Sequence, residues 1–182
     1  MNALDTHDTP RFLTHAIAGA QPVAVGLSMT LPGIPVIFAG DEFGLVGDDG
    51  EHSRTPMPWD RADVAAPTID LYSDLIHLRT GHAALNGGGM RWLHAGREVL
   101  VFIRETTEES ILLIAARGDF ETSLPAHAFA GMPRPLYGHA TVEVGGDVIR
   151  LSGTGPSFSA FALPGVVVPG FSATGTVLEL ES

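Results

Sequence analysis

The chain has 182 residues, of which 45% are hydrophobic and 17% charged, a composition typical of a folded globular protein of one large or two small domains. Its formal net charge is −11, and a nucleic-acid-binding protein would instead need a basic surface. It contains no cysteine, which excludes disulfides and thiolate zinc sites, and no apolar run approaches the ~20 residues that a membrane helix needs. We therefore expect no nucleic-acid or membrane partner, no metal and no cofactor.

The N-terminal residues 1–5 do not form the basic and apolar pattern of a signal peptide, and they look more like an internal cut than a natural start. This favours a cytoplasmic location but leaves the compartment open. A short helix is predicted to begin near Arg11, because residues 8–10 offer a cap followed by proline. A second helix is predicted from residue 21 to Pro32, with one stripe formed by Ala24, Leu27, Ser28 and Leu31.

One strand is predicted among these helices. Residues 36–39 form a short continuous apolar run, bounded by Pro35 and Gly40, which is typical of a strand buried on both faces of a parallel sheet. A long polar loop follows over residues 47–67, and loops of that length are often functional. The spacing of Leu71, Leu75 and Leu78 then predicts a helix that ends at Gly81.

After the glycine-rich stretch 86–89 the pattern changes to short strands. Turn residues separate β-rich runs at roughly ten-residue spacing, over residues 98–105, 110–117, 141–144, 148–152 and 157–163. This pattern predicts an antiparallel β-sandwich, with its clearest hairpin at residues 145–147. Another strand pair is predicted around Gly170 and Gly175. We therefore divide the chain into residues 1–86 and residues 87–182.

Four segments carry a family resemblance. Residues 4–11 (LDTHDTPR) resemble the last conserved catalytic stretch of the α-amylase family of glycoside hydrolases. Residues 31–44 (LPGIPVIFAGDEFG) are similar to that family's final barrel strand. Residues 54–60 (RTPMPWD) are similar to a loop of its α-glucosidase and maltodextrin-acting members, and residues 75–79 (LIHLR) are similar to its closing helix. The four motifs occur in the family's order, and the resemblance covers about residues 4–105.

The resemblance implies an α/β remnant, the last βα units of a (β/α)8 barrel, followed by an all-β antiparallel sandwich. It identifies the chain as a C-terminal fragment of a retaining hydrolase of α-glucosidic bonds, with an α-glucoside or maltodextrin as substrate. Retaining cleavage needs a nucleophilic and an acidic carboxyl group, and in this family both come from barrel strands that precede residue 1. The 182 residues alone are thus expected to be inactive, and either to self-associate through the uncovered strand 36–39 or to be locally disordered there while the sandwich stays ordered. The alternative is a non-catalytic carbohydrate-binding or interaction protein built on a barrel remnant.

By the same resemblance, Asp8 is the catalytic carboxylate that binds sugar hydroxyls and stabilises the transition state, and His7 donates a hydrogen bond to the same sugar. The family usually has asparagine where this chain has Thr6. The alternative for Asp8 is a helix cap. Arg11 is placed among the substrate-binding residues as a group that orients Asp8, or else it pairs at the surface. Trp59 is predicted to stack on a sugar, or to anchor its loop.

Other polar and aromatic residues are given structural roles. Asp41 and Glu42 follow the buried strand and are expected to accept hydrogen bonds from loop amides. Residues 48–52 contain three acids, but their spacing fails the EF-hand pattern, so a solvated loop is favoured over a calcium site. The remaining histidines lack metal-ligand spacing. The aromatic side chains on predicted strands are assigned to the core, namely Trp92, Phe102, Phe158 and Phe161.

Overall fold

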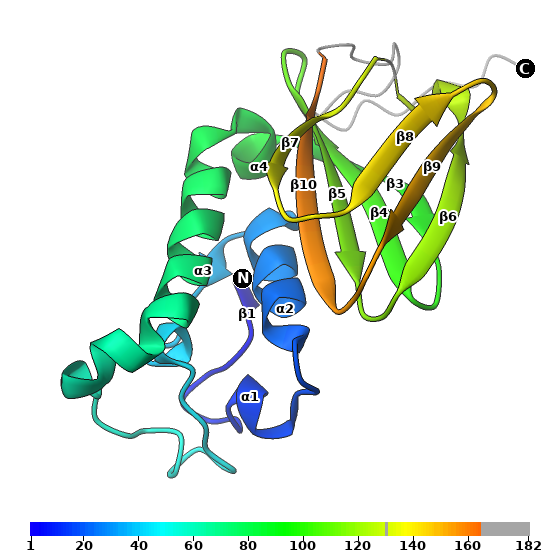
Figure 1. The fold of residues 1–182 in the computed structure, drawn as a ribbon. Coiled ribbons are helices and arrows are strands. Elements are labelled where there is room, and N and C mark those ends of the chain that lie inside the picture. The colour runs from blue at the N-terminus through cyan, green and yellow to red at the C-terminus, as the bar shows by residue number, and fades with distance from the viewer. Residues whose placement is uncertain (130, 165–182) are drawn as a thin grey trace, which may run out of the picture.

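The structure, a computed structural model, describes residues 1–129 and 131–164. Helices lie on one side of two antiparallel sheets (Figure 1). The strand pair predicted around Gly170 and Gly175 lies outside the described residues. In chain order the elements are β1 (Asn2–Ala3), α1 (Phe12–His15), α2 (Ala20–Thr30), β2 (Pro35–Val36), η1 (Asp41–Phe43), η2 (Trp59–Arg61), α3 (Ala62–Gly81), α4 (Ala83–Gly87), β3 (Gly89–Ala95), β4 (Val99–Glu105), β5 (Ser110–Ala116), β6 (Phe120–Pro125), η3 (Ala126–Ala128), β7 (Arg134–Tyr137), β8 (Thr141–Gly145), β9 (Val148–Gly153) and β10 (Ser157–Leu163).

The N-terminal part is built on a parallel strand pair. β1 pairs with β2, Asn2 opposite Pro35 and Ala3 opposite Val36, and α2 lies in the connection between them. The predicted parallel pairing is therefore confirmed, but the strand covers residues 35–36 rather than 36–39. It ends early because the Phe38 amide and the Ala39 carbonyl bond to side chains and not to another strand. Val36 and Ile37 are each 36% exposed, so within the described chain this strand is not buried on both faces.

The helices begin and end close to the predicted places, with two corrections. The most buried apolar side chains of α2 are Val25 and Met29, on either side of Gly26, where the helix rests closely on the sheet. Of the predicted stripe, Ser28 is buried, and Leu27 and Leu31 pack half-buried against the same apolar cluster. The polar loop ends at residue 58 and not at 67, since α3 already begins at Ala62. Pro67 lies inside α3, where its missing N–H removes one helical hydrogen bond. The end at Gly81 is confirmed.

The C-terminal part contains a five-stranded sheet, in the order β3-β4-β5-β10-β7, and a three-stranded sheet, in the order β6-β9-β8. All five predicted strands are present, with ends that differ by no more than a residue, and the sequence analysis missed β3, β6 and β7. The hairpin is confirmed: Gly145 pairs with Val148, and Gly146 in the turn has a φ of +58°. That φ lies in the left-handed region that glycine adopts without strain.

Two apolar clusters hold these layers together. The first lies between the sheets and includes Val101, Ile114, Ile149, Leu151 and Phe161. The second lies between the helices and the other face of the larger sheet, where Figure 1 shows α2 between α3 and β10, and it includes Val25, Met29, Tyr72, Leu75, Phe102, Ile111, Leu113 and Phe158. Helices and sheet thus share a core across the predicted boundary at residue 86. The three phenylalanines assigned to the core are buried, whereas Trp92 is 52% exposed on edge strand β3.

Two buried arginines bind the end of α2, Arg104 from strand β4 and Arg79 from helix α3. Arg104 donates hydrogen bonds to the carbonyl oxygens of Thr30 and, at 2.7 Å, of Gly88. Arg79 donates to the carbonyl oxygens of Met29 at 2.5 Å and Gly33 at 2.7 Å. Burial, and the nearby Arg79 charge, lower the pKa of Arg104 to about 10. The carbonyl groups at the negative end of the α2 dipole thereby stabilise both cations.

Candidate functional site

The candidate site lies where the two parallel strands end. Because β1 and β2 run in the same direction, residues 5–11 and residues 38–44 leave the strand pair at the same edge. The loop 47–54 crosses this edge. At Gly50 a Cβ atom would lie 3.0 Å from the His7 carbonyl oxygen, so the loop backbone contacts the backbone of the His7-Asp8 turn. Three segments that are distant in sequence therefore meet around residues 7 and 8.

His7, Asp8 and Arg54 form the exposed surface of the site. The His7 Nε2 atom lies 3.1 Å from Asp8 Oδ2, and Arg54 Nη2 donates to Asp8 Oδ1 at 3.2 Å. Arg54 Nε also donates to the His7 carbonyl oxygen at 3.0 Å. All three side chains are more than half exposed. A carboxylate held from both sides, yet open to solvent, is able to accept hydrogen bonds from the hydroxyl groups of a ligand.

Local hydrogen bonds define the turn that presents Asp8. The Asp8 amide donates to Thr6 Oγ1 at 3.2 Å, and the Thr6 amide donates to Thr9 Oγ1 at 3.0 Å. Helix α1 has no capping bond from Asp8. Its first amide, that of Phe12, instead donates to Asp5 Oδ1 at 2.6 Å. The interpretation of Asp8 as a helix cap is therefore wrong, because Asp5 supplies the acceptor and leaves the Asp8 carboxylate free for other partners.

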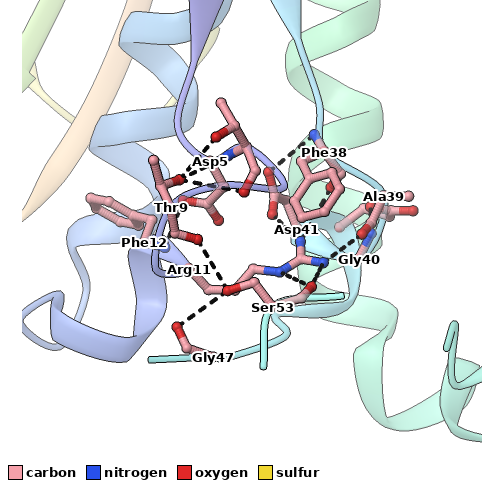
Figure 2. Close-up of polar contacts among 12 residues, drawn as sticks. Asp5, Thr9, Arg11, Phe12, Phe38, Ala39, Gly40, Asp41, Gly47 and Ser53 are labelled. Atoms are coloured by element: carbon pink, nitrogen blue, oxygen red, sulfur yellow. Dashed lines mark hydrogen bonds and ion pairs between the residues drawn. The ribbon is translucent and has the colours of Figure 1, made fainter. Parts of the chain in front are cut away.

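Arg11 lies beneath the turn and is only 1% exposed. Figure 2 shows its guanidinium group between residues 38–41, which follow β2, and Ser53 of the loop 47–54. It donates to Asp41 Oδ1 at 2.6 Å, to the Ala39 carbonyl oxygen at 2.8 Å and to the Ser53 carbonyl oxygen at 2.9 Å, and it lies 4.0 Å from the centre of the Phe38 ring. Both sequence-based expectations for Arg11 are corrected: it neither contacts Asp8 nor pairs at the surface. Since burial leaves its guanidinium no open side for a sugar, we do not keep it among the substrate-binding residues.

Asp41 and Glu42 have the structural role that the sequence predicts. Asp41 Oδ2 accepts from the Phe38 amide at 3.3 Å, and Glu42 Oε2 accepts from the Gly40 amide at 2.9 Å. Burial raises the pKa of Asp41 to about 7, helped by a hydrogen bond with the Asp5 carboxyl and by its charge, while Arg11 acts in the opposite direction. Residues 38–42, which follow β2, are thus held by acids whose carboxylate oxygens already accept hydrogen bonds from the protein.

Trp59 begins the short helix η2 and is 72% exposed. Its ring and the Phe43 ring form a T-shaped pair, with centroids 5.7 Å apart and planes at 88°. The indole thus contacts one neighbouring ring and is otherwise largely exposed, an arrangement that serves either sugar stacking or loop anchoring. In the acidic loop, Asp49 accepts from the amides of Glu51 and His52. Across residues 1–129 and 131–164 we find no group of acids and histidines able to hold a metal ion.

The sequence analysis missed three residues of this site. Arg54 binds Asp8, Asp5 caps α1, and the Ser53 hydroxyl donates to the Thr9 carbonyl oxygen at 3.1 Å. Arg54 lies 46 positions from Asp8, and no local pattern predicts such a pairing. Asp5 lies seven residues before the amide that it binds, a separation longer than that of the local capping pattern, whereas Asp8 fits that pattern.

Known proteins resemble this chain in sequence and in structure. No protein-family model matches it. Neopullulanase 2 of Thermoactinomyces vulgaris is 34% identical over 128 residues, which are 68% of this chain and 22% of that protein. A cyclomaltodextrinase of Bacillus sp is 35% identical over 117 residues, or 62% of this chain and 21% of that protein. The chain therefore spans about a fifth of the length of these curated relatives.

Solved structures agree. A cyclomaltodextrinase structure, 26% identical, superposes with a TM-score of 0.75 over 90% of this chain and 29% of that one. An Anoxybacillus α-amylase reaches a TM-score of 0.81 over 91% of this chain and 38% of that one, and its 21% identity shows the fold alone. The chain is thus homologous to glycoside hydrolases. More narrowly, it is a relative of the α-amylase family, and it matches a part of those enzymes in a way consistent with a C-terminal fragment. None of the described helices is both long and apolar enough to cross a bilayer.

Proposed function

We propose that this chain is the C-terminal part of a retaining glycoside hydrolase that acts on α-glucosidic bonds of oligosaccharides or α-glucans. In this proposal β1, β2 and the helices are the last βα units of a (β/α)8 barrel, and residues 87–182 belong to the domain that follows it, whose described part, residues 87–129 and 131–164, is the sandwich. The named relatives are a neopullulanase and a cyclomaltodextrinase, which supports a maltodextrin-type substrate.

One observation carries the proposal. The exposed His7-Asp8 turn lies at the carboxyl edge of a parallel strand pair, which is the edge where barrel enzymes place their active sites. A structural helix cap would not explain this turn, because Asp5 caps α1. The exposed Asp8 carboxylate has room for sugar hydroxyls, while the buried acids Asp5 and Asp41 do not.

Each residue has a distinct role in the proposal. Asp8 accepts hydrogen bonds from sugar hydroxyls and stabilises positive charge as it develops on the sugar ring, and His7 donates to the same sugar. Arg54 holds the Asp8 carboxylate, while Trp59 offers the open face of its indole to a sugar ring. Arg11 positions the loops from below. The nucleophilic and acidic carboxyl groups that retaining cleavage requires are supplied by residues outside these 182.

The test is a graft. Residues 1–164 replace the matching segment of a cyclomaltodextrinase, and hydrolysis of maltodextrin by the hybrid is measured beside that of the 182-residue chain alone. We expect turnover by the hybrid and none by the chain alone. A hybrid that folds and binds maltodextrin, yet does not hydrolyse it, would contradict the proposal.

A non-catalytic carbohydrate-binding protein is the second candidate, and the exposed indoles of Trp59 and Trp92 favour it. Calorimetric titration of the 182-residue chain with maltoheptaose separates the two. Binding that Trp59→Ala or Trp92→Ala abolishes, with no hydrolysis in the hybrid, would favour this second function. Sugar binding that appears only in the hybrid favours the hydrolase, because the remainder of the active site is then needed.

A further inference from the structure

Asp5 and Asp41 form a buried pair of carboxyl groups beneath the His7-Asp8 turn. Their exposed fractions are 4% and 5%, and together with Tyr72 they line one small cavity of about 10 Å³. Two carboxylates in such contact cannot both be ionised without strong repulsion, so one of them keeps a proton. The positive charge in contact with the pair is that of Arg11, whose Nη1 atom lies 2.6 Å from Asp41 Oδ1. One proton therefore leaves the group of three electrically neutral.

The other polar groups that face the pair do not change this balance. From α3, the buried Tyr72 hydroxyl faces it, and the pKa of Tyr72 is raised, first by burial and then by the charges of Asp41, Asp5 and Glu42. From α2, Gln21 Nε2 donates to the Asp41 carbonyl oxygen at 3.4 Å, and Gln21 is neutral. Glu42 is bound to the Gly40 amide. If the pair also lost its remaining proton, none of these groups would supply a positive charge to balance the second carboxylate.

The pair is connected to the turn by two routes. Asp5 Oδ1 accepts from the Phe12 amide, which closes the segment that contains residues 7 and 8 (Figure 2). Arg11 holds the Ser53 carbonyl oxygen, and the Ser53 hydroxyl in turn holds the Thr9 carbonyl oxygen. The next residue along the loop, Arg54, binds the Asp8 carboxylate. Hydrogen bonds thus connect the pair to both sides of Asp8.

We propose that Asp5 and Asp41 share one proton against the single charge of Arg11, and that these three residues are the positioning unit of the His7-Asp8 turn. The importance of this unit for catalysis rests on the proposed function, but its charge state does not. Either carboxyl group is replaceable by an amide of the same size, because the remaining carboxylate then balances the charge of Arg11 without a shared proton. Replacing both leaves the buried guanidinium without a counter-charge.

The test is a double-mutant cycle in the 182-residue chain, with Asp5→Asn, Asp41→Asn and the two combined. Amide hydrogen exchange at Phe12 and Ser53 reports the closure of the turn. We expect each single variant to keep protection within about tenfold of the parent and the combined variant to lose about 100-fold or more, or to unfold. Asp48→Asn, Asp60→Asn and their combination are the matched control, since both residues are exposed and their effects should be additive. Additive losses across the Asp5 and Asp41 cycle, or unfolding of both single variants, would overturn the proposal.

A second measurement follows the proton itself. In the parent chain, one carboxyl carbon of the pair should titrate near neutral pH in NMR spectra, and the Thr9 and Ser53 amide signals should shift with it. In Asp41→Asn this common transition should disappear. If no carboxyl carbon titrates near neutral pH in the parent, or the two amides stay constant, the shared proton is refuted. These readouts need no turnover, so a failed hydrolysis test and a failed proton test remain distinguishable.

Discussion

The packing of helix α2 on the larger sheet gives a prediction that depends on one glycine. A Cβ atom at Gly26 would lie 2.3 Å from Cγ of Phe158 and 2.4 and 2.6 Å from its two Cδ atoms. Phe158 is 2% exposed and belongs to the cluster shared by helices and sheet, so its ring has little room to move. We therefore examine the substitution Gly26→Ala.

Two effects of opposite sign decide its result. Alanine in a helix interior is favoured over glycine by about 1 kcal/mol. Overpacking a well-filled core costs about 1–3 kcal/mol, and contact with three ring atoms below 3 Å places this site toward the upper value. The free energy of unfolding should thus fall by about 1–2 kcal/mol.

Urea unfolding followed by far-ultraviolet circular dichroism measures this change. Gly81→Ala is the matched control, because Gly81 is also helical but a Cβ there meets nothing within 4 Å. The control should be as stable as the parent or slightly more stable. If Gly26→Ala is as stable as Gly81→Ala, the close contact between α2 and Phe158 does not exist in solution and the reasoning is refuted.

Three further predictions concern the strand-end region. Arg11→Met should lower the free energy of unfolding by about 3–5 kcal/mol, because it leaves buried acids without their cation, whereas exposed Arg61→Met should change it little in the same urea assay. Because the pKa of Asp41 is raised from 3.8 to about 7, the folded state binds its proton more tightly, so this contribution to stability falls as pH rises from about 4 to 7. Asp41→Asn should remove that slope, at most about 1.4 kcal/mol per pH unit, and equal slopes in both proteins would contradict it. Self-association through residues 36–39 should appear as a concentration-dependent sedimentation coefficient that Ile37→Asp reduces, and a strictly monomeric parent would exclude it.

The antiparallel part of the fold was the most predictable from sequence. Residues 110–116 and 157–163 are continuous β-rich runs bounded by turn residues, and each became a central strand buried on both faces. Strands β3, β6 and β7 were missed because all three lie at sheet edges, and β6 and β7 also carry exposed polar residues. Their pairing depends on long-range contacts, which a local pattern does not contain.

The candidate site was predictable where residues are adjacent in sequence. His7 and Asp8 were found from a short motif, and the structure places their side chains in contact. Arg11 was misassigned because a charged residue three positions after Asp8 suggested a local partner. Its actual partners lie at residues 38–41 and 53, and they meet it only after β1 and β2 pair. Burial of a cation depends on such tertiary contacts and is not visible in composition or spacing.

The role of Asp8 is the central claim, and one kinetic comparison tests it most directly. In the hybrid that carries residues 1–164, kcat/KM for maltodextrin is measured for Asp8→Asn and for the exposed control Asp48→Asn, with circular dichroism confirming that both fold. The account predicts a loss of about 10²–10³-fold or more for Asp8→Asn, since the carboxylate acts on the transition state, and near-parent activity for Asp48→Asn. Equal activity of the two folded variants would remove Asp8 from the active site and contradict the account.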